Sequence, residues 1–326
     1  MFGEVDYRFA PGLTVTAGLR SYWLKQTIDN IVDGYLNFGS TPSDPQTNHQ
    51  YGVSPKLSVS YQPTKSSTFY ASAAKGFRAG GAQASLPFCS LPSLSAYDIT
   101  HLKSDTLWTY EAGAKLALSR PAMAVSAAVF RIDWSNFQQL ATLPCGSFVS
   151  INGEKARILG AEMEVAGNPI PSVGARFSIG YTNTSAEEPG NLRLIGLAEG
   201  DALPGIPDWT FSLSLDHSRP ISRRLTGFLA ADYSYTSHST ALLNAGAGTV
   251  AVRPAYQLVN SRIGIRWDRS ELAFNLRNLT DEKINFGDVG YNGYAQFGVG
   301  GIAGGLIPVV VTHQPLTVTL QLKQSF

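Results

Sequence analysis

Apolar and polar residues alternate along the C-terminal segment of this chain. Polar Thr, Gln and Lys residues separate the apolar ones, which are Leu316, Val318, Leu320 and Leu322, with the terminal Phe326 on the same parity. A period of two over about ten residues is expected of a strand that crosses a membrane within a barrel. Helical spacing would scatter the same residues around a cylinder. The segment therefore predicts a strand with one apolar and one polar face.

The same alternation recurs upstream and predicts about 13 strands in all. In one of them Trp108 and Tyr110 fall on the apolar parity, and Glu111 and Lys115 fall on the polar parity. Because a strand directs successive side chains to opposite faces, each such segment has an apolar face and a polar face. The pattern runs through residues 4–9, 13–23, 53–61, 108–118, 173–182, 209–216, 225–235, 259–267, 272–277 and 316–326.

The connections between these segments alternate in length. Short turns on one rim and long loops on the other are typical of an outer-membrane barrel, where they are periplasmic and extracellular respectively. The sequence therefore predicts an all-β fold, a transmembrane antiparallel β-barrel segment. The short connections lie near 10–12, 63–66, 119–121, 168–172, 218–223 and 268–270, and the long ones near 31–50, 78–104, 138–148, 185–204, 237–254 and 281–313.

Composition supports this interpretation. Charged residues make up 15% of the 326 positions, against roughly 25% in soluble domains. No stretch reaches the run of about 18 apolar residues that a membrane helix requires. The net charge of +1 comes without a basic stripe, so no nucleic-acid partner is predicted. Tryptophans near the ends of predicted strands suggest aromatic girdles at the membrane interfaces; they are Trp23, Trp108, Trp134, Trp209 and Trp267.

A soluble sandwich or a lipocalin-like barrel would alternate in the same way, with its apolar face buried and with shorter loops. The charged residues of the predicted strands suit either a water-filled lumen or the outside of such a soluble sheet. The alternation alone therefore leaves this alternative open. These charged residues are Arg20, Lys56, Glu111, Lys115, Arg176, Arg262, Arg266 and Arg277.

Several segments resemble those of TonB-dependent receptor barrels. Residues 70–81 resemble the family's strand that ends in a Gly-Phe-Arg turn. Residues 102–115 resemble a second strand, with Asp105 where the family more often has Glu. Residues 130–134 and 155–164 are similar to the strands that come next, residues 278–283 are similar to a late signature, and the terminal Phe326 is similar to the aromatic end that the barrel-assembly machinery recognises.

The resemblance implies an importer of a scarce nutrient, such as a ferric siderophore, in the outer membrane of a Gram-negative bacterium. Receptors of this family close about 22 strands around a plug domain. On this interpretation, residues 1–326 form the C-terminal portion of one barrel domain, without the plug and the early strands. The implied partners are outer-membrane lipid, the assembly machinery through Phe326, the TonB energy-coupling complex through the plug region, and a small-molecule or metal-chelate ligand.

The N-terminus shows no signal-peptide pattern, and alternation is already under way at Val5. This predicts a chain that begins inside a barrel. Two other functions remain open at this point. One is a passive porin or fatty-acid channel of about 14 strands, and the other is a structural or adhesin barrel.

Candidate binding residues come from the long connections. Aromatic rings there are suited either to stacking on a ligand or to packing loops together, and the candidates are Tyr97, Tyr291, Tyr294 and Phe297. Cys89 and Cys145 lie in neighbouring long connections on the same predicted rim and suit one disulfide outside the cytosol. Histidine spacings match no metal motif, and hydrolase motifs are missing. The sequence therefore predicts no metal site, no cofactor and no enzyme.

Overall fold

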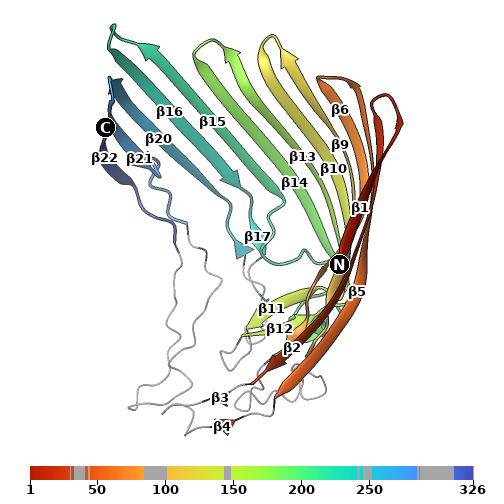
Figure 1. The fold of residues 1–326 in the computed structure, drawn as a ribbon. Coiled ribbons are helices and arrows are strands. Elements are labelled where there is room, and N and C mark those ends of the chain that lie inside the picture. Colours follow the sequence, from red (N-terminus) through yellow and green to blue (C-terminus); the bar gives the residue numbers. More distant parts are fainter. Residues whose placement is uncertain are drawn as a thin grey trace, which may run out of the picture.

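The computed structural model describes residues 1–29, 31–32, 41–42, 45–83, 101–142, 148–240, 243–244, 252–284, 286 and 312–325. Thirteen long strands form one antiparallel sheet with the order β1-β2-β5-β6-β9-β10-β13-β14-β15-β16-β20-β21-β22. Each long strand pairs with the next one along the chain, and β1 and β22 lie at the two edges (Figure 1). The predicted all-β fold and its strand number are confirmed.

The long strands are β1 Phe2–Ala10, β2 Leu13–Ile28, β5 Gln46–Thr64, β6 Ser67–Arg78, β9 Asp105–Ser119, β10 Ala122–Ser135, β13 Lys155–Ile170, β14 Val173–Glu188, β15 Trp209–Pro220, β16 Leu225–Thr236, β20 Tyr256–Trp267, β21 Ser270–Arg277 and β22 Thr317–Gln324. The short elements are β3 Ile31–Val32, β4 Thr41–Pro42, β7 Gly81–Ala82, β8 His101–Leu102, β11 Gln138–Thr142, β12 Phe148–Asn152, the 3₁₀ helix η2 Gly190–Ile195, β17 Ser239–Thr240, β18 Leu243–Asn244 and β19 Val252–Arg253.

The two ends of the sheet differ, as the connection lengths predicted. One end, here called the turn rim, carries the tight connections, such as the one at Gly12, whose φ of 76° favours glycine. The opposite end, here called the loop rim, carries β3, β4, β11, β12 and β17 (Figure 1). Some strands extend further toward the loop rim than the alternation predicted. β5 already begins at Gln46, and β14 continues to Glu188.

Pairing confirms the predicted faces of the sheet. Leu57 lies opposite Ala17 on one side and Ala73 on the other, so apolar residues meet across neighbouring strands. This apolar face is open, and the exposed fractions of Leu57 and Leu322 are 54% and 68%. A soluble sandwich needs a second layer over such a face, and the described residues supply none. In the described part of the chain, no helix has the length and apolar character needed to cross a membrane.

The polar face is concave. Glu4 in β1 and Lys56 in β5 both lie opposite Gly18 of the intervening strand β2. Their side chains nevertheless meet, with 3.0 Å between Lys56 Nζ and Glu4 Oε2. Side chains two strands apart reach each other because the sheet curves toward this side. The register also places on this face the charged residues predicted for it, which are Arg20, Lys56, Glu111, Lys115, Arg176, Arg262, Arg266 and Arg277.

One girdle tryptophan was assigned to the wrong face. Trp23, Trp108, Trp209 and Trp267 lie on the apolar face by their register. Trp134 instead lies on the concave face, opposite Leu107 and Ala156. Its ring centroid is 6.0 Å from that of Phe137, and the Arg78 guanidinium carbon is 5.5 Å from it. The prediction failed because the alternation reverses here: Trp134 shares its parity with the apolar Phe130 and Ile132, and the register places that parity on the concave face.

Candidate functional site

A polar cluster at the loop rim joins the end of β6 to the start of β9. Arg78 and Asp105 are direct partners in the ladder between these strands. Arg78 donates from Nε and Nη2 to Asp105 Oδ2 at 2.9 and 2.6 Å, and its backbone N–H donates to Oδ1 at 3.0 Å. The Asp105 side chain is only 1% exposed. Three charge-assisted hydrogen bonds therefore satisfy a carboxylate that has lost its water.

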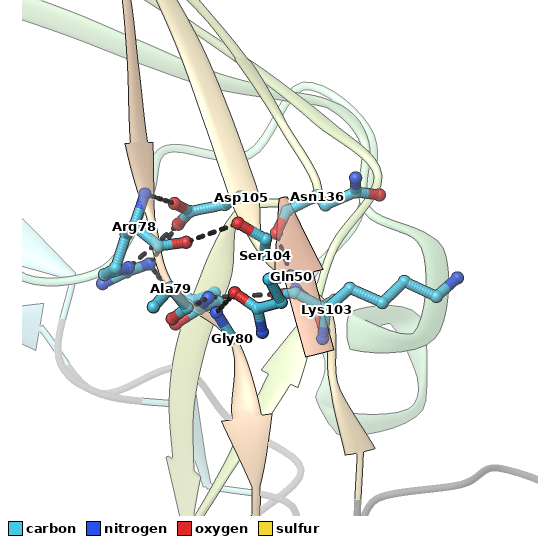
Figure 2. Close-up of polar contacts among 10 residues, drawn as sticks. Gln50, Arg78, Ala79, Gly80, Lys103, Ser104, Asp105 and Asn136 are labelled. Atoms are coloured by element: carbon cyan, nitrogen blue, oxygen red, sulfur yellow. Dashed lines mark hydrogen bonds and ion pairs between the residues drawn. The ribbon is translucent and has the colours of Figure 1, made fainter. Parts of the chain in front are cut away.

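The same cluster holds the backbone of three segments together (Figure 2). Arg78 Nη2 also donates to the carbonyl of Gln138 at 3.0 Å. The Gln138 amide donates to the carbonyls of Ala79 and Lys103 at 3.1 and 3.0 Å. Ser104 Oγ donates to the Arg78 carbonyl at 2.9 Å. We call Arg78, Ser104, Asp105 and Gln138, together with Asn152, the loop clamp.

Asn152 extends the loop clamp to β12. Its Oδ1 accepts from the Lys103 backbone N–H at 2.8 Å, and its Nδ2 donates to the carbonyls of Lys103 and Asn136 at 3.1 and 2.7 Å. Both polar atoms of this half-buried amide are therefore used in hydrogen bonds. The β11–β12 pair is thereby fixed to the connections that lead into β7 and β9.

The end of β6 also bends over the concave face of β2 and β5. Pairing between β5 and β6 ends at Ala74. Beyond this point Phe77 stacks on Tyr22, with 3.5 Å between ring centroids and 7° between ring planes. The backbone N–H of Gly80 donates to Gln50 Oε1 at 3.0 Å (Figure 2). The Gly-Phe-Arg segment thus crosses the inside of the sheet at its mouth.

A small apolar core lies beside the loop clamp. The connection after β14 folds back onto the concave face of β13 and β14, where the Leu203 backbone N–H donates to Thr184 Oγ1 at 2.8 Å. Burial of apolar side chains then holds this connection against the sheet. The members, here called the rim core, are less than a tenth exposed and are Phe137, Ala156, Ile158, Ala186, Leu192, Leu197 and Leu203.

The middle of the concave face carries a hollow of about 470 Å³. Small residues line it, including Ala128 and Gly180, together with Glu111, Glu162 and Tyr70. Tyr70 Oη donates to Glu111 Oε1 at 2.6 Å. The wall therefore offers oxygen acceptors and hydroxyl groups to a polar solute.

Aromatic rings lie across glycines on this wall. Tyr70 is the ladder partner of Gly113, and a Cβ atom added to Gly113 would collide with the Tyr70 ring. Phe130 has the same relation to Gly160. Glycine is needed there because the neighbouring ring occupies the space of its side chain. These ring–glycine pairs are Tyr22–Gly52, Tyr70–Gly113, Phe130–Gly160 and Phe228–Gly264.

A second charged cluster lies on the last strands, nearer the turn rim. Glu271 of β21 binds two guanidinium groups of β20, accepting from Arg262 Nη2 and, at 2.8 Å, from Arg266 Nε. Both guanidinium carbons also lie over the Phe228 ring, 5.3 and 4.2 Å from its centroid. We call Arg262, Arg266 and Glu271 the wall triad. Beside it is a hollow of about 390 Å³ lined by Asn260, Asn275 and Arg277.

The candidate site residues from the sequence lie outside the described residues. This applies to Tyr97, Tyr291, Tyr294 and Phe297, to the proposed Cys89–Cys145 pair and to Phe326, all of which stay predictions. Among the residues that the structure describes, no group of three His, Cys, Asp or Glu side chains is placed to hold a metal ion. The loop clamp was not anticipated, although the Gly-Phe-Arg and Ser-Asp motifs that form it stood out in the sequence.

Comparisons with known proteins agree with this architecture. The family model for the TonB dependent receptor-like β-barrel matches residues 1–279. The ferric-catecholate import receptor Fiu from E. coli K12 is similar, with a TM-score of 0.73 and 17% identity over 100% of this chain and 44% of that one. The ferric yersiniabactin uptake receptor FyuA from Yersinia pestis has a TM-score of 0.69 and 16% identity, over 87% of this chain and 40% of that one.

A third solved structure gives the same picture. The siderophore receptor PiuA from Acinetobacter baumannii has a TM-score of 0.68 and 14% identity, covering 97% of this chain and 41% of that one. The chain thus spans less than half the length of each of these receptors. The shared fold and the family model, which covers most of the chain, lead to one conclusion. The chain belongs to the TonB-dependent receptor β-barrel family.

Proposed function

We propose that this chain is barrel wall of an outer-membrane receptor that imports a scarce metal chelate, such as a ferric siderophore. The observation that carries the proposal is the division of the sheet into an open apolar face and a concave polar face. In a bilayer, backbone groups must be paired within the sheet, and an outward apolar face meets lipid while a polar face lines the passage. The similar solved structures include proteins described as ferric import receptors.

The wall would act on the chelate by non-covalent contacts. Hydroxyl, amide and charged groups of the two hollows are suited to transient hydrogen bonds with a polar ligand. Release toward the periplasm requires contacts that are weak and distributed along the wall. The loop clamp and the rim core would hold the mouth in a fixed shape, so that ligand selection takes place on a rigid support.

The partners follow from the family and are part of the proposal. They are outer-membrane lipid at the apolar face, the barrel-assembly machinery at Phe326, the TonB energy-coupling complex, and the chelate itself. The Gram-negative outer membrane is the proposed location. No covalent step is assigned to the chain.

Uptake of ⁵⁵Fe-labelled chelates by iron-limited cells tests the function. Deletion of the gene that encodes the chain should abolish uptake of at least one chelate, and the intact gene should restore it. A protonophore that collapses the inner-membrane gradient should stop uptake. Uptake that continues without the gradient would point to a passive channel, and normal uptake with a loss of surface attachment would point to an adhesin.

Fractionation tests the location independently. The protein should appear in the outer-membrane fraction and require detergent for extraction. The folded form should migrate differently from the boiled form on a detergent gel. A protein that stays soluble without detergent would contradict the membrane assignment.

A further inference from the structure

A group of charged side chains interrupts the apolar face near the loop rim. Arg131 and Asp133 of β10 continue the parity of Val129, whose side chain is 59% exposed on the apolar face. In the ladder, Tyr110 lies opposite Arg131, and Asp133 lies opposite Arg157 of β13. These charges therefore point away from the concave face. The alternation that otherwise keeps charged residues on the polar wall does not hold here.

The charged groups hold one another in place. Arg131 donates from Nη2 and Nε to Asp133 Oδ1 at 2.9 and 3.1 Å, and Arg157 Nε donates to the same oxygen at 3.4 Å. Glu187 Oε1 lies 3.2 Å from Arg157 Nη1. The Arg131 and Arg157 side chains nevertheless remain 49% and 38% exposed. Each guanidinium group has five N–H donors, so both keep donors that none of these contacts uses.

The position along the strand places the group at the end of the apolar band. A tilted strand crosses the hydrocarbon core in about 9–11 residues. β10 begins at Ala122 on the turn rim, so Arg131 is its tenth residue and Asp133 its twelfth. The two charges thus lie at the level of the lipid headgroups on the loop-rim side. Trp108 and Tyr110, whose ring centroids are 6.2 Å apart, lie beside them and are residue types common at this interface.

Two later strands present aromatic side chains at the corresponding position. On the same face and toward the same rim, β15 and β16 present Trp209, Tyr233 and Tyr235. The register adds Lys75 of β6, which lies opposite Trp108 and has no ion pair with a described residue. The resulting set, here called the rim patch, contains three cationic side chains and two carboxylates, and its members are Lys75, Arg131, Asp133, Arg157 and Glu187.

We propose that the rim patch binds a phosphate on the headgroup of an outer-leaflet lipid. The proposal rests on the proposed outer-membrane location. A guanidinium group matches phosphate oxygens with paired N–H donors, which a lysine ammonium does not. Asp133 accepts from both guanidinium groups and therefore competes with a lipid phosphate for their donors. The rim patch has one more positive than negative side chain, which favours an anionic partner. Because its side chains point away from the concave face, a lipid can reach them and a solute inside the barrel cannot.

The test uses the full chain, extracted from outer membranes and exchanged into neutral detergent. The probe is lipid A, a phosphorylated glycolipid, added in mixed micelles, with dephosphorylated lipid A as the matched ligand. Native mass spectrometry measures the bound lipid. The double variant Arg131→Gln/Arg157→Gln should lower the affinity for lipid A by about tenfold, because it removes charge-assisted hydrogen bonds. Binding of dephosphorylated lipid should already be weak in the unchanged chain.

Two further variants separate lipid binding from a purely structural role. Arg176→Gln, on the concave face with its side chain 68% exposed, is the matched control and should bind lipid A like the unchanged chain. Asp133→Asn removes the competing carboxylate and should bind lipid A at least as tightly. The proposal is overturned if the double variant binds normally while folded, as judged by heat-modifiable migration, or if Asp133→Asn loses binding. Fractionation and iron uptake in the same strains show separately whether the proposed location and function hold.

Discussion

The loop clamp and the wall triad each pair a carboxylate with arginine on the concave face, but they are built differently. Asp105 of the clamp is 1% exposed, whereas Glu271 of the triad is 17% exposed. The clamp joins Arg78 to Asp105 across 27 positions and reaches β11 and β12 as well. The triad lies within one hairpin, where Arg266 and Glu271 are direct ladder partners.

The difference shows that the same type of ion pair contributes differently to the structure depending on its burial. A buried carboxylate cannot return to water when its partner is lost, so the clamp makes its segments depend on one another. Glu271 keeps some contact with water, and its arginine partners are 36% and 50% exposed, so the triad mainly orients its side chains. We therefore expect the clamp to hold the segments of the loop rim together. We expect the triad to affect mainly the charge distribution on the concave face.

The largest effect should come from breaking the clamp. Arg78→Met leaves Asp105 buried without its partner and should lower the free energy of unfolding by about 3–5 kcal/mol. Urea unfolding in detergent micelles, followed by tryptophan fluorescence, measures this. The double variant Arg78→Met/Asp105→Leu should recover part of the loss. Equal losses in the single and double variants would show that burial of the charge is not the cause.

Removal of packing next to the clamp should cost less. Leu203→Ala opens a cavity in the rim core and should lower the free energy of unfolding by about 3 kcal/mol. Leu118→Ala, at a site 48% exposed on the apolar face, is the matched control in the same micelles. If both substitutions lower the free energy of unfolding equally, Leu203 in the rim core contributes no more to stability than a leucine that contacts detergent.

A ring–glycine pair tests the wall between the two clusters. Gly160→Ala forces a methyl group into the Phe130 ring and should cost about 2 kcal/mol. Gly3→Ala is the control, because nothing lies within 4 Å of a Cβ atom there. Thermal unfolding followed by heat-modifiable migration compares the two. If Gly3→Ala is as unstable as Gly160→Ala, the collision with the Phe130 ring is not the cause of the destabilisation.

The smallest effect should come from the triad. Glu271→Gln keeps the shape of the side chain and should cost about 1 kcal/mol or less, since its partners are substantially exposed. The difference between variant and unchanged chain should shrink at high salt, which screens exposed charges. Urea unfolding at low and high salt checks both points. A loss as large as that of Arg78→Met would erase the contrast between the two clusters.

The faces of the sheet were predictable because alternation is local. Leu57 and Lys56 are neighbours, and the strand geometry alone sends them to opposite sides. The order of the long strands followed from the short turns, which leave little choice but pairing with the next strand. Trp134 shows a limit of the alternation, since it shares parity with the apolar Phe130 and Ile132 and only the register places these residues on the concave face.

The site was much less predictable. Arg78 and Asp105 stood in recognisable motifs, yet their contact depends on a register that the connection between them does not reveal. The approach of Gln138 and Asn152 depends on how β11 and β12 fold back. Arg131 and Asp133 broke the alternation, but only the pairing with Arg157 shows that the three charges meet. Such contacts join distant segments, which a periodic pattern cannot encode.

The ring–glycine pairs have a consequence for the width of the passage. A ring that lies flat over a glycine adds little more than its own thickness to the wall, whereas an upright ring would project into the lumen. Bulky residues therefore line the interior without narrowing it, and the missing side chain sets the clearance. A methyl group at Gly113 or Gly160 would collide with the ring of its ladder partner, so the shape of this surface depends on residues that have no side chain.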